Sequence, residues 1–180
     1  MTGTNAPRPH DPHAAPDPTP FGVDPATLRV PGDPAMGEVH ERVRHADVTE
    51  EPVSTVQMAE AVTDARCGAV VTFDGRVRDH DDGRDVIGLE YSAHPDAPAI
   101  AVRVAHAIAE RYPDVLVAVT HRYGALAIGE TALACAIAAP HRKLALAACD
   151  DLVDTIKREL PIWKHQRFAD GTDEWVGALG

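Results

Sequence analysis

The chain has 180 residues, of which 44% are hydrophobic and 25% charged, and its formal net charge is −11. This length suits one domain with a sizeable core, or one domain with a tail. The acidic balance argues against non-specific nucleic-acid binding, because phosphate would be repelled. The sequence contains neither an apolar run of about 18 residues nor the apolar stretch of a secretory signal, so we expect a cytoplasmic protein that does not enter a membrane.

Residues 1–44 differ in composition from the remainder. Nine of the 15 prolines lie at or before Pro34, among Asp, His, Gly and Ala, and the stretch shows no period of two or of 3.6. We predict a disordered Pro/Asp/His-rich tail over 1–44, followed by a single domain over 45–180. Because no apolar pattern connects the tail to a core, we expect deletion of residues 1–40 to leave the fold intact.

Beyond the tail, strand-like and helical patterns alternate. We predict strands at 46–52, 68–78, 86–91, 115–123, 131–139 and 162–164. We predict helices at 54–66 with Ser54 as N-cap, at about 98–112, and at about 141–160. A polar turn over 79–83 and a connection over 124–129 join strands. This order of elements indicates a mixed α+β fold.

Lysine is the first chemical signal. Of the 17 basic residues 14 are Arg, and the three lysines, Lys143, Lys157 and Lys164, lie in the last 38 residues. An amine can attack a carbonyl or hold an oxyanion, whereas a guanidinium stays protonated and is a poor nucleophile. The alternative is that Lys157 is an ordinary cation near a helix C-terminus, favoured by the macrodipole. Pro161 lies between Lys157 and Lys164, and a turn there can bring both amines toward one place.

Two further basic groups suit an anionic ligand. His141 and Arg142 precede and begin the last helix, where free N–H groups favour phosphate or carboxylate, although His141 can equally be a simple N-cap. Arg76, Arg78 and His80 share one face if the strand over 68–78 stays regular as far as His80.

Metal and disulfide patterns are weak. The acids between Asp79 and Asp85 lack the spacing of a calcium loop, and His10 and His13 have no partnering Cys. Cys67, Cys135 and Cys149 form no CxxC pair, so we interpret them as reduced core residues.

Several strings together resemble the catalytic large subunit of molybdopterin synthase, the MoaE family. They are GAVVTFDGRVRDHDDG (68–83), EYSAHPDA (90–97), VTHRYGALAIGE (119–130), APHRKLAL (139–146), TIKRELPIWKHQ (155–166) and DEWV (173–176). The resemblance covers roughly residues 45–178 in order. It implies an α/β-hammerhead-like fold with an antiparallel sheet and three main helices.

The resemblance also implies a reaction and partners. Sulfur passes from the Gly-Gly thiocarboxylate of a small ubiquitin-like, MoaD-like subunit to cyclic pyranopterin monophosphate, without a metal or cofactor. The large subunits form a homodimer within a heterotetramer. The two essential lysines of the family fall on Lys157 and Lys164. Its His-Arg pair falls on His141 and Arg142, and its loop arginine falls on Arg78.

One position departs from the family pattern, and some candidates are weaker. The family commonly has Glu two residues after the second lysine, where this chain has Gln166. Arg76, His80 and Lys143 are secondary candidates. Two other functions stay open from the sequence: a non-catalytic scaffold that binds a ubiquitin-like tail, and a metal-dependent phosphohydrolase that uses the acids of residues 79–85.

Overall fold

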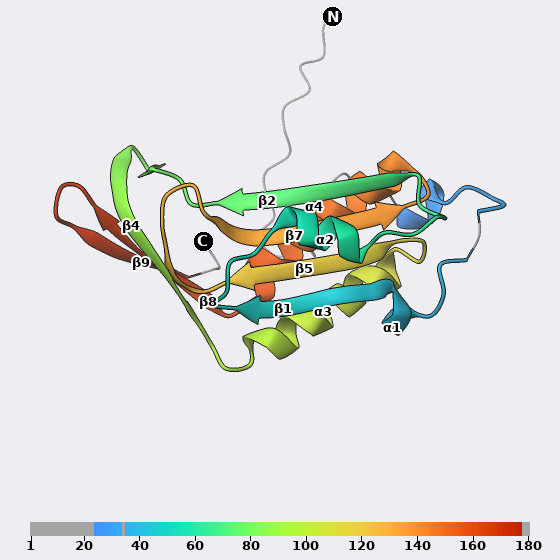
Figure 1. Ribbon diagram of the computed structural model, residues 1–180, viewed down its shortest axis with the longest axis horizontal. Helices are drawn as coiled ribbons and strands as arrows, with labels where there is room; N and C mark the ends of the chain where they lie inside the picture. The colour runs from blue at the N-terminus through green and yellow to red at the C-terminus, as the bar shows by residue number, and fades with distance from the viewer. Residues whose placement is uncertain (1–23, 34, 178–180) are drawn as a thin grey trace, which may run out of the picture.

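Two β-sheets and the helices packed on them make up the part of the chain that the structure, a computed structural model, describes: residues 24–33 and 35–177 (Figure 1). Within these residues three helices exceed one turn, and strands and helices alternate, which confirms the expected α+β class with three main helices. The prediction for residues 1–23 lies outside the described residues.

The first sheet has the strand order β1-β5-β7-β2. These strands are β1 (Val43–Thr49), β5 (Leu116–Arg122), β7 (Thr131–Ala139) and β2 (Ala69–Arg76). The β1–β5 pair is parallel and the other two pairs are antiparallel. β5 and β7 are central, and their buried parts are apolar at residues 116–119 and 132–139, as a sheet covered on both faces requires.

Helices cover both faces of this sheet. The helix α3 (Ala97–Arg111) packs on β1 and β5, and α4 (Arg142–Glu159) packs on β7 and β2. The shorter α2 (Thr55–Ala61) lies on the opposite face, in front of the sheet in Figure 1. Along β7, Leu133 and Ile137 belong to the core under α3 and α4, whereas the alternate alanines face α2. Strand alternation thus builds two cores from one strand.

The second sheet extends beyond one end of the first (Figure 1). Its order is β3-β4-β8-β9, with β6 also paired to β4. The strands are β3 (His80–Asp81), β4 (Arg84–Ala93), β8 (Ile162–Phe168), β9 (Asp173–Gly177) and β6 (Gly124–Leu126), and all their pairings are antiparallel. Among the described residues, no helix combines the length and apolarity needed to cross a bilayer.

The segment before β1 packs on the domain. It contains a 3-10 turn, η1 (Pro25–Leu28), and a one-turn helix, α1 (Val39–Arg42). Met36 is only 2% exposed and packs with Met58 and Val62 under α2. Ordered structure therefore begins well before the expected boundary at residue 44, and deletion to residue 40 would remove a buried side chain.

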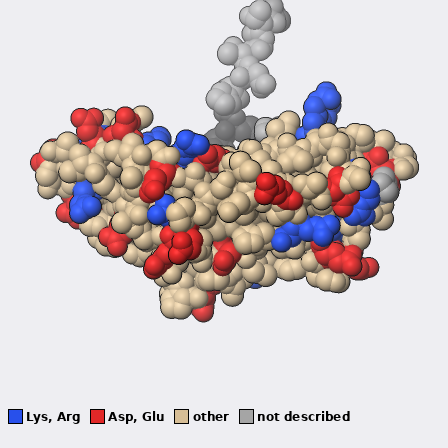
Figure 2. Space-filling model, viewed as in Figure 1, with Lys and Arg blue, Asp and Glu red and all other residues tan. Residues whose placement is uncertain are grey.

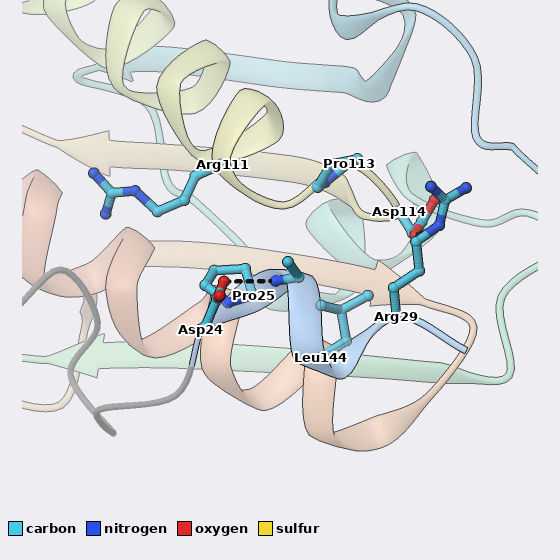
Figure 3. A pocket seen from close by; sticks show the side chains of 8 residues that line it. Asp24, Pro25, Arg29, Arg111, Pro113, Asp114 and Leu144 are labelled. Atoms are coloured by element: carbon cyan, nitrogen blue, oxygen red, sulfur yellow. Dashed lines mark hydrogen bonds and ion pairs between the residues drawn. The ribbon is translucent and has the colours of Figure 1, made fainter. Parts of the chain in front are cut away.

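Two arginines attach this segment to the end of α3. The buried Arg42 guanidinium donates to the carbonyl oxygens of Ala109 and Tyr112, while Arg29 pairs with the buried carboxylate of Asp114 at 2.9 Å. A cavity of about 370 Å³ lies between η1, the end of α3 and Leu144 of α4 (Figure 3).

Most predicted elements are confirmed and a few differ. The Ser54 hydroxyl accepts from Val56 N at 3.2 Å, as expected of an N-cap. The predicted connection over 124–129 contains β6, a three-residue strand that pairs with the distant β4, and β9, a short strand that pairs with the preceding β8, was not predicted. The strand predicted over 68–78 ends at Arg76, where its register with β7 shifts.

Candidate active site

A cluster of one carboxylate and three donors lies where the second sheet meets the end of β2. Asp81 Oδ2 accepts from Lys164 Nζ at 2.9 Å and from Gln166 Nε2 at 2.7 Å. Asp81 Oδ1 accepts from an Arg78 guanidinium nitrogen at 3.0 Å. These donors lower the pKa of the Asp81 carboxyl, the Gln166 and Lys164 hydrogen bonds most strongly. The structure thus brings together Arg78 and Lys164, two of the candidates from the sequence.

A tight hairpin delivers Asp81 to this cluster. Asp82 and Gly83 form the two-residue loop between β3 and β4, and both have positive φ, 48° and 74°. This is the conformation in which an Asp-Gly loop joins two antiparallel strands. Because β4 lies between β3 and β8, the Asp81 carboxylate reaches across β4 to Lys164.

Tyr91 and His121 form the aromatic side of the same site, and residue patterns alone did not single them out. Tyr91 pairs with Lys164 in the β4–β8 register, so their side chains share a face. The Tyr91 and His121 rings meet edge to face, with centroids 5.2 Å apart. Burial lowers the pKa of His121 to about 4, so the ring is neutral at pH 7. His121 follows the apolar run 116–119 and Thr120 near the end of β5, which is the one sequence signal for it.

Lys157 lies toward the same end of the first sheet. It is an exposed residue in the last turn of α4, and its Nζ is 5.9 Å from the centroid of the Phe73 ring on β2. Phe73 precedes Arg78 by five residues along the strand that leads to the cluster. Within the described residues no carboxylate pairs with Lys157. The amine is therefore held over an aromatic face and left open to solvent.

His141 and Arg142 lie at the other end of α4. Arg142 begins the helix and precedes Lys157 by fifteen residues, a separation of about 22 Å along the axis. His141 holds the N-cap position without a capping hydrogen bond, and its Nε2 lies 3.1 Å from Asp33 Oδ2 of the N-terminal segment. One chain therefore does not bring this pair to the two lysines. Lys143 is exposed beside them.

The condition for Arg76, Arg78 and His80 to share one strand face, a strand that stays regular as far as His80, is not met. The strand ends at Arg76, and Val77 turns inward to 4% exposure while its N–H donates to Glu130 O at 3.0 Å. Arg76 instead pairs with Asp74 at 2.6 Å, and His80 pairs with the adjacent Asp79 at 2.7 Å, both at the surface.

Two of the acids that the alternative metal-dependent phosphohydrolase would use face cations: Asp79 faces His80, and Asp81 faces Arg78 and Lys164. In the part of the chain that the structure describes, no three His, Cys, Asp or Glu side chains are placed to hold a metal ion.

Two cavities beside the described residues are lined by neither Lys157 nor Lys164. One is the 370 Å³ space of Figure 3, and the other, about 440 Å³, lies between β1 and α2. Acidic and basic side chains are interspersed over the face shown in Figure 2, without a continuous basic surface. Within the cluster around Asp81, the side chains of Asp81 and Lys164 are 26% and 24% exposed, whereas that of Arg78 is 65% exposed.

Comparison with known proteins gives matches over the same region. The family model described as MoaE protein matches residues 48–159. The molybdopterin synthase catalytic subunit of Bacillus subtilis is 36% identical over 132 residues, which are 73% of this chain and 83% of that protein. The crystal structure of molybdopterin synthase from Staphylococcus aureus is 34% identical, with a TM-score of 0.69 over 73% of this chain and 96% of that chain.

A more distant structure shares the fold. It is a Helicobacter pylori complex of subunits 1 and 2 of molybdopterin-converting factor, 20% identical with a TM-score of 0.55, over 73% of this chain and 88% of that chain.

Proposed function

The chain belongs to the MoaE family, and we propose that Lys157 and Lys164 carry out the sulfur transfer of a molybdopterin synthase catalytic subunit. In this reaction, sulfur leaves the thiocarboxylated C-terminus of a small ubiquitin-like subunit and enters cyclic pyranopterin monophosphate. The product carries the dithiolene of molybdopterin. The chain works in the cytoplasm, a reducing compartment that suits the free, buried thiols of Cys135 and Cys149.

The observation that carries the proposal is that Lys164 and Arg78 share one carboxylate, Asp81, beyond the end of β2, the strand whose Phe73 ring lies 5.9 Å from the Lys157 amine. Both reactants are anions, so an acidic protein needs a local group of cations to bind them. Arg78 is 65% exposed and contacts Asp81 through one guanidinium nitrogen, so its other donors can bind a phosphate. Its planar fork of donors suits that ligand better than an ammonium does.

Lys157 acts on the thiocarboxylate carbonyl. Its exposed amine has no acidic partner among the described residues, so it is available to attack the carbonyl carbon or to hold the oxyanion. Lys164 orients the substrate from the cluster around Asp81. The partner tail must be extended and narrow at its end, because two glycines without side chains let a terminal carbonyl approach the amine closely.

His141 and Arg142 complete the site from a second copy of the chain. A rigid helix separates Arg142 from Lys157 by about 22 Å, which no side chain can span. In a two-fold homodimer, the start of α4 in one protomer can approach the end of α4 in the other. Two such protomers with two small subunits form the heterotetramer.

The test is reconstitution. The purified protein is mixed with thiocarboxylated small subunit and cyclic pyranopterin monophosphate, and molybdopterin is measured. Lys157→Ala and Lys164→Ala should lose turnover while still binding the small subunit. Arg158→Ala, a basic neighbour of Lys157 that pairs with Glu159, is the matched control and should retain it. Full turnover in both lysine variants would overturn the assignment, and loss of small-subunit binding in both would favour the scaffold function.

A further inference from the structure

We propose that Asp81 is a positioning residue of this site: it fixes Lys164 relative to Arg78, and the buried amide of Gln166 fixes Asp81. The inference rests on the proposed function of Lys164. It concerns the support of the lysine rather than the reaction itself.

Both oxygens of the Asp81 carboxylate are in use. Oδ2 receives Lys164 Nζ and Gln166 Nε2, at 2.9 and 2.7 Å, and Oδ1 receives Arg78 at 3.0 Å. Charge-assisted hydrogen bonds of this kind are shorter and stronger than neutral ones. Asp81 therefore lies between two cations that would otherwise repel each other, and it sets the distance between them.

Gln166 restrains the Asp81 carboxylate from within the second sheet. It is 3% exposed and lies in the centre of the second sheet, paired with Leu89 on β4 and Glu174 on β9. A buried amide without a hydrogen-bond partner costs free energy, and the Gln166 side chain is enclosed by the sheet. Gln166 therefore restrains the position of the Asp81 carboxylate. A Glu at position 166 would instead bring a second carboxylate within hydrogen-bond distance of Asp81.

This arrangement bears on the position where the chain departs from the family pattern. The resemblance implies Glu at the position of Gln166, and in this chain the carboxylate that contacts Lys164 stands on the β3–β4 hairpin. The hairpin thus supplies one carboxylate, that of Asp81, and β8 supplies one amide, that of Gln166. The backbone of the hairpin, with positive φ at Asp82 and Gly83, keeps Asp81 aimed at β8.

The test uses the exchange of these two groups. Asp81→Asn preserves size and removes the charge, and should lower kcat about ten- to a hundredfold, the usual loss for a charge-assisted hydrogen bond. Gln166→Glu should lower kcat similarly, with partial recovery at acidic pH as the two carboxylates come to share a proton. The double variant, Asp81→Asn with Gln166→Glu, restores one carboxylate and one amide, and should recover most of kcat. Asp85→Asn, an exposed acid of the same hairpin, is the matched control.

A second readout does not depend on turnover. The three lysines are acylated with a limiting amount of an anhydride, in the presence of a small free amine as a competing standard. The extent of acylation of each lysine is then quantified by peptide mass spectrometry. Lys164 should react several-fold faster in Asp81→Asn and return to the wild-type rate in the double variant, with Lys143 unchanged as internal reference.

The outcomes separate the two proposals. If wild-type protein makes no molybdopterin but Asp81→Asn changes the rate of Lys164 labelling as expected, the proposed function is refuted and the positioning role of Asp81 is supported. If wild-type protein turns over and neither kcat nor Lys164 labelling responds to Asp81→Asn, the positioning role is refuted. A double variant no better than the single variants would also refute it.

Discussion

Arg142 and Lys157 stand at opposite ends of one helix, fifteen residues and about 22 Å apart. If both act on one substrate, they belong to different protomers. This relationship gives a direct test of the homodimer.

Co-expression of Arg142→Ala and Lys157→Ala chains should restore activity that neither variant has alone. In a two-fold dimer with shared sites, each mixed dimer contains one intact site, so random assembly should give about a quarter of wild-type turnover. The measurement is molybdopterin formation by the co-purified mixture, with differently tagged chains to show that mixed dimers form. Activity no higher than that of the separate variants would show that Arg142 and Lys157 do not form one active site across the dimer.

Lys157→Arg and Lys164→Arg should lose turnover nearly as fully as the alanine variants, by at least about a hundredfold. The guanidinium keeps the charge but displaces it and has no accessible free base. Turnover and affinity for the small subunit are measured in parallel, and affinity should be retained. Arginine variants with normal turnover would show that only the positive charge is needed.

Met36→Ala should lower the free energy of unfolding by about 2–4 kcal/mol, as expected when a core methionine is truncated. Met36 is 2% exposed against Met58 and Val62. Deletion of residues 1–23 should leave stability unchanged, whereas deletion of residues 1–40 should destabilise the domain. The measurement is urea unfolding, with Val30→Ala, at a position 44% exposed, as the control. A fully stable 1–40 deletion would show that the N-terminal segment contributes nothing to the core.

Stability should fall as the pH decreases from about 6.5 to about 4, in part through His121. Burial lowers the pKa of His121 to about 4, so in this window the unfolded chain takes up a proton that the folded chain does not. The decrease in the free energy of unfolding is complete below pH 4 and absent above pH 7, and its size is on the order of 3 kcal/mol. Unfolding free energies of the wild type and His121→Gln are compared at pH 7 and pH 4. Equal pH dependence in the two proteins would contradict the assignment, whereas carboxylates such as Asp81 contribute equally to both.

Local patterns in the sequence were enough to predict much of this protein. The apolar run of β7, the Ser54 cap and the periodicity of α3 and α4 each depend on neighbours within a few residues, so they could be predicted without tertiary information. The scarcity of lysine likewise drew attention to Lys157 and Lys164, since it is a property of composition.

Tertiary structure decided how those residues are combined. The contact of Asp81 with Lys164 spans 83 residues and that with Gln166 spans 85, and both depend on the β3–β4–β8 pairing, which no local pattern specifies. The strand ends at Arg76, after the register shift that follows Gly75, and Arg76 and Arg78 then pair with different acids, Asp74 and Asp81; the end of a strand depends on its neighbour β7. The helix that joins Arg142 to Lys157 was predicted from local periodicity. The pairing of His141 with Asp33 and the position of Lys157 near the Phe73 ring depend on how this helix packs on the sheet, which local patterns do not specify.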